Sequence, residues 1–411
     1  MQNSRSSLPS RSPRAGIALP DVNDVPIIVH SHLRWDFVWQ RPQQILARMA
    51  ARHPVAFIEE PMRTDADTHL VVTEPQPNIV RIVPMLAHAR CGTVDEQCAQ
   101  VMPLLEQAFR EHPLLAGRFA GAIEWFYSPM VAPAMLGKLG DAGVVYDCMD
   151  ELAQFRGAPA DLSRRELELI AQADVVFTGG YQLYSRKSQH HDNVHFYGCG
   201  VDVEHYGRAR HPDTAIPADV ATLPHPVLGY FGVIDERLDY ALIEALADAF
   251  PGGSVVMVGP TAKVDPAKLP QRANLHWLGQ RPYEDLPAYT KAFDVCLMPF
   301  ALNEATENIN PTKTLEYMAA GKPVISTAVP DVIRNFVPIV EVAYSHDEFI
   351  AMAARAAAEP DPESIARGID RARAETWDAI VEAMRGHMLS AVRARQSAAS
   401  RPSTVEQETS Q

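Results

Sequence analysis

The sequence has few of the features that mark several common protein classes. It contains only five cysteines among 411 residues, an odd number without a C-x-x-C spacing, so neither a disulfide framework nor a cysteine zinc site is indicated. No apolar run approaches the ~20 residues that a helix needs to span a bilayer. The first 24 residues are basic and rich in Ser and Pro, without the apolar centre of a secretory signal. We therefore expect reduced, mostly buried thiols and a cytoplasmic location.

Positive charge and the common nucleotide fingerprints are also scarce. The 37 basic and 51 acidic side chains leave a net charge of -14, which argues against nucleic acid as a general partner. Neither G-x-G-x-x-G nor G-x-x-x-x-G-K-[ST] occurs, which weakens the dinucleotide and P-loop interpretations. The one D-x-D, Asp65-Ala66-Asp67, lies between polar segments and predicts a turn rather than a manganese site. We expect no metal site and no cofactor.

What the chain does contain is a regular alternation of apolar runs and helical segments. With 411 residues it exceeds the size of a single hydrophobic core, and the alternation is typical of parallel βαβ sheets. The predicted strands are 26–30, 55–60, 122–128, 144–150 and 173–180, followed after a Pro-rich break by 227–233, 254–260, 274–280, 295–300, 323–329 and 339–344. The predicted fold class is α/β, with two doubly wound Rossmann-like domains that face each other across a cleft.

The same pattern predicts the domain bounds. In order, we expect a flexible leader, a first domain, a linker, a second domain, C-terminal helices and a flexible tail, at 1–24, 25–207, 208–225, 226–345, 346–394 and 395–411. Ligands of such sheets bind outside the carboxyl ends of the strands, which here means the cleft between the domains.

The stretch NINPTKTLEYMAAGKPVIST, residues 308–327, predicts a loop, a helix and a strand. Asn310 is a suitable N-cap and Pro311 a suitable first helical residue, with the helix running to about Ala320. Its first turn would present unpaired amides at a positive helix end, which favours an anion. These amides belong to Thr312, Lys313 and Thr314.

Lys313 would add a full charge at this helix end, and Glu316 lies on the same face. A carboxylate repels phosphate but accepts hydrogen bonds from a sugar diol, so the pair suits a nucleoside diphosphate. The alternative is an ordinary exposed i,i+3 ion pair, worth roughly 0.2–0.5 kcal/mol.

Four segments in order resemble motifs of GT-B retaining glycosyltransferases of the family 4 type. They are YGCGVDVEHY (197–206), YFGVIDER (230–237), LHWLGQRPYEDL (275–286) and EYMAAGKPV (316–324). The amino half, with SHLRWDFVWQRPQQILARMA (31–50) and VVYDCMDELAQF (144–155), is similar to bacterial cell-surface polysaccharide enzymes, including teichuronic-acid-type glycosyltransferases.

The resemblance implies a GT-B enzyme that moves a sugar from a nucleotide-sugar donor, expected to be a UDP-sugar, to a glycan or lipid-linked acceptor in cell-surface polysaccharide synthesis. Peripheral contact with the inner face of the plasma membrane is left open. A GT-B nucleotide-sugar epimerase and a non-catalytic nucleotide-sugar-binding protein are the alternatives. The last helix, anchored by Trp377, is expected to cross back to the first domain.

The resemblance also implies the residues that hold the donor. Lys313, Arg237 and the amides of Thr312 and Thr314 would bind the diphosphate next to the glycine turn at Gly232. The remaining donor residues would be Arg281 and Tyr283 beside the base, Glu316 at the ribose and Asn308 near the sugar. Asn308 replaces a glutamate of the family pattern, and Val233 an arginine, so retention or inversion of the sugar stays open.

Acceptor residues are expected at the strand ends of the first domain. Asp150 could accept the proton of the acceptor hydroxyl, with Asp147 as the alternative base, although either could cap the next helix. A mixed set of rings and charged donors after the first strand suits a carbohydrate or a pyrophosphate, unless it is simply an exposed loop over buried tryptophans. This set is Arg34, Trp35, Asp36, Gln40 and Arg41.

Overall fold

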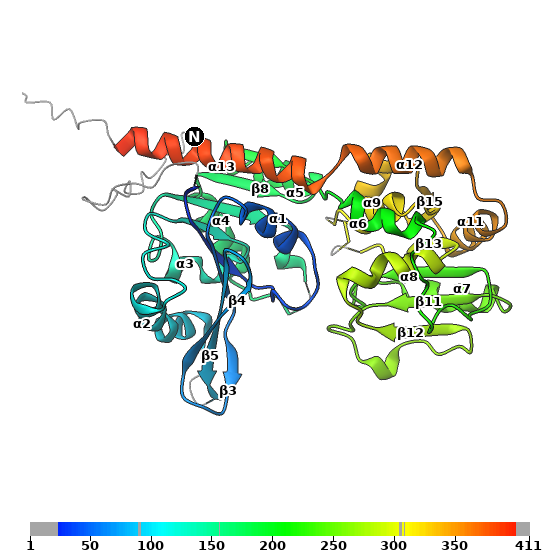
Figure 1. Cartoon of the computed structure of the whole chain (residues 1–411), viewed down its shortest axis with the longest axis horizontal. Helices are drawn as coiled ribbons and strands as arrows, with labels where there is room; N and C mark the ends of the chain where they lie inside the picture. Colours follow the sequence, from blue (N-terminus) through cyan, green and yellow to red (C-terminus); the bar gives the residue numbers. More distant parts are fainter. Residues whose placement is uncertain (1–23, 89–91, 156, 304–305, 308, 400–411) are drawn as a thin grey trace, which may run out of the picture.

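The computed structural model of the chain describes residues 24–88, 92–155, 157–303, 306–307 and 309–399. Two β-sheets, each covered by helices, lie next to each other along the long axis of the molecule (Figure 1). This arrangement confirms the predicted α/β class with two parallel, doubly wound sheets.

The first sheet has nine strands in the order β3-β5-β2-β1-β6-β7-β8-β9, and β4 pairs antiparallel with β5. Its central strands are buried along their whole length because helices cover both faces. The strands are β1 (Ile27–Ser31), β2 (Val55–Glu59), β3 (Met62–Thr64), β4 (His69–Gln76), β5 (Ile79–Ala87), β6 (Ile123–Phe126), β7 (Gly143–Cys148), β8 (Val175–Thr178) and β9 (Val194–Phe196). Their helices are α1 (Arg41–Met49), α2 (Val94–Glu111), α3 (Ala132–Met135), α4 (Leu162–Ile170) and α5 (Tyr181–Lys187).

The second sheet has six parallel strands in the order β12-β11-β10-β13-β14-β15. The strands are β10 (Val227–Phe231), β11 (Ser254–Val258), β12 (Leu275–Gly279), β13 (Val295–Met298), β14 (Val324–Thr327) and β15 (Glu341–Ala343). Their helices are α6 (Val203–Gly207), α7 (Tyr240–Ala249), α8 (Leu286–Ala292), α9 (Lys313–Ala319), α10 (Pro330–Phe336) and α11 (His346–Ala358). The strand order reverses next to β10, a point where such sheets bind ligands.

Two C-terminal helices connect the domains. Helix α12 (Pro362–Ala374) lies on the second domain, and α13 (Trp377–Ala399) runs along the first (Figure 1). Trp377 is buried in the core of the first domain, and Val201 pairs with Thr376 where the chain passes between the domains. Because α13 continues to Ala399, the segment from 395 to 399 is helical, contrary to the flexible tail that we predicted there.

Two parts of the first sheet have no counterpart among the predicted strands. One is the short edge strand β9, and the other is the arm formed by β3, β4 and β5, which projects from the domain (Figure 1). Asp65 and Asp67 lie in the connection between β3 and β4, as a polar turn would. Among the described residues, no helix is both long enough and apolar enough to cross a membrane.

Candidate active site

A cleft of about 550 Å³ separates the two domains. The first domain lines it with the loop after β1, with Asp150 after β7 and with Gly179 after β8. The second domain contributes the turns after β10, β11 and β12 and the beginning of α9. Both sheets therefore direct the carboxyl ends of their strands toward one cavity, as we expected.

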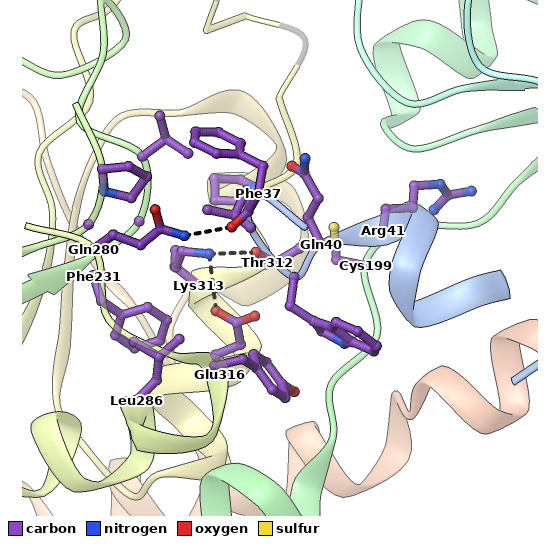
Figure 2. Close-up of a pocket in the computed structure, with 18 of the residues that line it drawn as sticks. Phe37, Gln40, Arg41, Cys199, Phe231, Gln280, Leu286, Thr312, Lys313 and Glu316 are labelled. Atoms are coloured by element: carbon purple, nitrogen blue, oxygen red, sulfur yellow. Dashed lines mark hydrogen bonds and ion pairs between the residues drawn. The ribbon is translucent and has the colours of Figure 1, made fainter. Parts of the chain in front are cut away.

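Helix α9 places the Lys313 and Glu316 side chains in the cleft wall (Figure 2). The Lys313 Nζ lies 3.2 Å from the Glu316 Oε2 and 3.0 Å from the Thr312 Oγ1. Glu316 is only 5% exposed, and its Oε2 has no hydrogen-bond partner among the described residues, so the Lys313 contact is an ion pair without hydrogen-bond geometry. The i,i+3 pair therefore exists, but it lines the cavity rather than an exposed surface.

The start of α9 differs from the predicted one. The helix has seven residues and begins at Lys313, with Thr312 as the N-cap, instead of beginning at Pro311. The predicted cap, Asn310, donates its side-chain Nδ2 to the Gly179 carbonyl at 3.3 Å, across the domains. In so short a helix the aligned peptide dipole is small, and the full charge of Lys313 dominates.

The three predicted amides behave differently. The Thr314 amide donates to the Pro311 carbonyl at 3.3 Å, and its hydroxyl is fully buried 3.4 Å from the Met298 sulfur. Thr314 therefore cannot bind a ligand, and its prediction as a donor residue is wrong. The amides of Thr312 and Lys313 make no hydrogen bond to another described residue, so both can donate to a ligand.

Two glycines bring the backbone close to Lys313. Gly232 and Gly259 follow β10 and β11 with φ of 152° and 149°, a region that side chains disfavour. A Cβ on Gly259 would lie 1.7 Å from the Gly232 carbonyl oxygen, and one on Gly232 would lie 3.0 Å from the Lys313 Cε. Glycine at both positions keeps the cleft open beside the lysine.

Arg237 lines the same part of the cleft. Its Nε and Nη2 donate to the Asp235 carboxylate, with the closest contact at 2.7 Å. Nη1 makes no hydrogen bond to another described residue. Asp235 thus fixes the guanidinium while one donor group stays available.

The structure distinguishes the two aspartates predicted as bases. Asp150 lines the cleft, and no described residue donates a hydrogen bond to its carboxylate. Burial raises the pKa of Asp150 to about 6, although the charge of Arg237 opposes the shift. Asp147 is 0% exposed, does not line the cleft and is held by Arg41, so its prediction as the base is wrong.

Arg41 is a structural residue rather than an acceptor ligand. Its Nη2 and Nε donate to Asp147 at 2.9 and 3.1 Å, and its Nη1 donates to the carbonyls of Tyr197 and Gly198 at 2.8 and 3.2 Å. Figure 2 shows the guanidinium pointing away from Lys313. Arg41 lines the cleft, but all three of its nitrogens donate to protein groups, so the structure leaves no free guanidinium donor for the predicted acceptor contact.

The remaining acceptor candidates lie in different environments. Arg34 donates to Glu59 at 3.1 Å and does not line the cleft, so its predicted role is also wrong. Trp35 is buried against Phe57, with ring centroids 5.2 Å apart, and only borders the cavity. Asp36 and Gln40 both line the cleft, but the Asp36 carboxylate pairs with Arg81 at 2.5 Å.

The side chains expected near the base build the cleft wall. Arg281 donates to the Tyr289 hydroxyl at 2.6 Å and to Asp219 at 3.0 Å. Tyr283 stacks on His205 at 4.0 Å between ring centroids and accepts a hydrogen bond from Gln44 at 3.1 Å. Both side chains are thus engaged within the protein, and only their backbone groups remain for a base. Asn308 lies outside the described residues.

Contacts between the domains include residues that sequence reasoning missed. The Gln280 Nε2 donates to the Phe37 carbonyl at 2.7 Å across the cleft (Figure 2), and Trp39 lies 5.7 Å from Tyr283 between ring centroids. No local sequence pattern predicts such contacts, because the two residues of each contact lie far apart in the chain. Gly259, in contrast, directly follows an apolar strand, as Gly232 does. The position of a glycine after an apolar strand could therefore have identified Gly259 from the sequence.

No group of three or more His, Cys, Asp or Glu side chains within the described ranges has the arrangement of a metal site. Asp65 and Asp67 do not line the cleft. Among the described residues, the charged side chains that line the cleft are Lys313, Glu316, Arg237, Asp150 and Glu284, together with Asp36, Arg41 and Arg281, which are paired with Arg81, Asp147 and Asp219.

Comparison with known proteins matches residues 225–371 to the family Glycosyl transferases group 1. TuaH of Bacillus subtilis, named as a candidate teichuronic acid biosynthesis glycosyltransferase, is 27% identical over 216 residues. That alignment covers 48% of this chain and 53% of TuaH, so the chain spans about half the length of the curated relative it matches.

Solved structures resemble nearly the whole chain. A sucrose-phosphate synthase from Thermosynechococcus elongatus has a TM-score of 0.64 at 17% identity, covering 90% of this chain and 99% of that one. An E. coli structure, described as trehalose-6-phosphate bound with UDP-2-fluoro glucose, has a TM-score of 0.63 at 14% identity and covers 89% and 99%. A UDP-forming α,α-trehalose-phosphate synthase from Burkholderia vietnamiensis scores 0.63 at 13% identity and covers 92% and 99%. The chain therefore has the two-domain GT-B fold of these proteins, and residues 225–371 of its second domain match the group 1 glycosyl transferase family.

Proposed function

We propose that the chain is a glycosyltransferase that moves a sugar from a nucleotide diphosphate, expected to be UDP, to a hydroxyl of an acceptor. The observation that carries this proposal is the distribution of charge in one cleft. Lys313, Arg237 and the Glu316 carboxylate lie on the wall of the second domain, and Asp150 lies on the wall of the first. A donor held on one wall would then meet an acceptor activated on the other.

The second domain supplies the groups that a nucleoside diphosphate requires. The Lys313 ammonium can donate to phosphate oxygens. So can the amides of Thr312 and Lys313 and the Arg237 Nη1, none of which donates to another described residue. The Glu316 Oε2, which is buried and has no hydrogen-bond partner in the part of the chain that the structure describes, can accept from ribose hydroxyls. Binding the diphosphate exchanges the Lys313–Glu316 ion pair for contacts of each group with the ligand.

In the transfer step, the bond between the anomeric carbon and the phosphate oxygen breaks, and a bond to the acceptor oxygen forms. The acceptor proton passes to the Asp150 carboxylate, whose burial makes it a stronger base than an ordinary aspartate. The departing diphosphate gains negative charge, which the fixed donors of Lys313 and Arg237 stabilise without reorganisation.

The proposal for the chemical class of the acceptor depends on the similar proteins. TuaH is named for teichuronic acid biosynthesis, which supports a glycan or lipid-linked acceptor in cell-surface polysaccharide synthesis. The UDP-2-fluoro glucose named in the E. coli structure supports UDP as the nucleotide of the donor. We propose that the reaction takes place on the cytoplasmic side of the cell envelope.

The test is nucleotide binding by isothermal titration, with UDP, GDP and ADP compared. Lys313→Ala should weaken UDP binding about 10–100-fold, because a charge-assisted contact contributes roughly 1.5–3 kcal/mol. The control is Lys322→Ala, which removes an ammonium that caps the Lys291 and Phe293 carbonyls and does not line the cleft. UDP affinity that is equal in the wild type and Lys313→Ala would contradict the assignment.

A further inference from the structure

An ionic cluster lies behind Asp150, on the side away from the cleft. The Lys187 Nζ lies 3.0 and 3.2 Å from the two oxygens of Glu151 and 2.8 Å from the Glu166 Oε2. The side chains of Lys187 and Glu166 are each 7% exposed, and that of Glu151 is 11% exposed. None of the three lines the cleft, so the cluster has no direct contact with a ligand there.

The cluster joins the loop of Asp150 to three elements of the first domain. Lys187 ends α5, Glu166 belongs to α4, and the Glu166 Oε1 accepts from the Tyr146 hydroxyl on β7 at 2.7 Å. Glu151 is the next residue after Asp150. The ammonium of Lys187 therefore connects the strand before the loop, the loop itself and the two helices that follow it.

The backbone of Asp150 is held at its carbonyl oxygen. Its carbonyl accepts from the Leu152 amide at 3.1 Å and lies 3.6 Å from the Cys148 sulfur. Its carboxylate, in contrast, receives no hydrogen bond from any described residue. The direction of the Asp150 carboxylate thus depends on where the backbone of the loop is fixed. The side chain nearest to Asp150 in the sequence that fixes this backbone is that of Glu151.

Stability alone is a weak reason for such a cluster. Removing charges from water is costly, and apolar replacements of buried ion pairs are often neutral or stabilising. A fixed loop has a clear benefit for a reaction, because a displacement of about 1 Å can cost ~10²-fold in rate. The cluster therefore matches a requirement for precise placement better than a requirement for stability.

We propose that Lys187, acting through Glu151, is a positioning residue that holds the loop of Asp150 against the cleft. This inference rests on the proposed function, because Asp150 is the base in that reaction. Release of Glu151 would let the loop move toward solvent and give the Asp150 carboxylate access to water.

The charged groups that act on the Asp150 carboxylate come from both domains. They are Arg237, Asp235, Arg41 and Lys263. None of them belongs to the Lys187 cluster, so a substitution at Glu151 leaves all four in place. A shift in the titration of Asp150 that occurs in Glu151→Ala, but not in Glu151→Gln, which removes the same charge, would then report a movement of its loop.

The main variant is Glu151→Ala in the full chain. It cuts the link to the loop but leaves Lys187 paired with Glu166, so that no buried charge loses its partner. We expect kcat to fall about 10–100-fold while UDP affinity stays within about twofold of the wild type. The acid limb of the kcat profile, expected near pH 6, should move to lower pH because the exposed carboxylate titrates closer to its ordinary value.

Arg186→Met is the matched control, because Arg186 lies 3.7 Å from the same carboxylate but is 44% exposed. It should leave kcat and the pH profile unchanged. Glu151→Gln, which keeps an oxygen to accept from Lys187, should restore most of the lost activity. A merely structural role would lower the melting temperature of Glu151→Ala without moving its pH profile.

A second readout does not require turnover. Infrared difference titration can follow the Asp150 carboxyl, assigned by the signal that Asp150→Asn loses, in the wild type and in Glu151→Ala. Equal titration and equal kcat in these two proteins would overturn the positioning role. A shifted titration without sugar transfer in the wild type would instead refute the proposed function and retain the structural link between Glu151 and Asp150.

Discussion

The ion pair between Arg41 and Asp147 gives a direct test of the site as the structure defines it. Arg41 looks like a ligand residue in the sequence, whereas in the structure it makes three contacts of 2.9–3.3 Å with Asp147 and two with backbone carbonyls. Arg41→Leu would leave a carboxylate that is 0% exposed without its partner. We therefore expect a loss of stability rather than a selective loss of acceptor binding.

The magnitude follows from the cost of an unpaired buried charge. Removing one partner of a buried pair costs about 3–5 kcal/mol, and a domain has about 5–15 kcal/mol in total. The first domain of Arg41→Leu should thus lose at least about a fifth of its free energy of unfolding, and up to all of it if the domain is only marginally stable. Arg41→Leu combined with Asp147→Leu should recover much of this loss, because it removes both charges together.

Urea unfolding followed by tryptophan fluorescence is the appropriate assay. Trp35, Trp39, Trp125 and Trp377 belong to the core of the first domain or pack against it, so the signal reports mainly on that domain. Arg48→Leu, on the same helix, is the control, because its partners Asp378 and Asp202 are 78% and 34% exposed and surface pairs contribute about 0–1 kcal/mol. If Arg41→Leu unfolded within about 1 kcal/mol of the wild type and raised only the KM for the acceptor, the structural role would be refuted.

Two further predictions concern the cleft. Because the pKa of Asp150 is raised to about 6, kcat/KM should fall as the pH drops below that value. The folded state also binds this proton more tightly than the unfolded state, so Asp150 lowers the stability of the wild type as the pH rises from about 4 to 6. Asp150→Asn should therefore gain stability over the wild type through that window. A pH-rate profile and melting curves at pH 4.5 and 8 measure both effects, and an active Asp150→Asn would exclude Asp150 as the base. Gly259→Ala should weaken UDP binding more than 10-fold or prevent folding, because its Cβ would lie 1.7 Å from the Gly232 carbonyl oxygen. The control is Gly252→Ala, which has open space around the Cβ and should bind UDP normally in the same titration. Normal UDP binding by Gly259→Ala would contradict the close approach of these two turns.

The fold was largely predictable because its signal is local. Each buried strand is a short apolar run, and the period of the runs predicts the two parallel sheets. The resemblance to family 4 glycosyltransferases, based on motifs between 197 and 330, is confirmed by the match of residues 225–371 to the group 1 family. The projecting arm was missed because β4 consists of exposed and half-exposed residues and because Arg81 and Pro84 interrupt the apolar run of β5.

Individual site residues were less predictable, because the sequence does not show which donors the protein itself occupies. Arg41 is used by Asp147, which lies 106 residues away, and Arg281 by Asp219, 62 residues away. The start of α9 shifted for a similar reason, since the side chain of Asn310 is taken by Gly179 of the other domain. In contrast, Lys313 and Glu316 are neighbours on one helix, and their mutual geometry followed from the helical period.

The same contacts suggest how the cleft admits a ligand. Single hydrogen bonds from Gln280, Gln44 and Asn310 cross between the domains, and each contributes only about 0.5–1.5 kcal/mol. Contacts this weak permit a domain motion about the single β-bridge between Val201 and Thr376, where the chain passes between the domains. A ligand that bridges the Lys313 wall and the Asp150 wall interacts fully only in the closed arrangement, and that difference in affinity shifts the equilibrium toward closure.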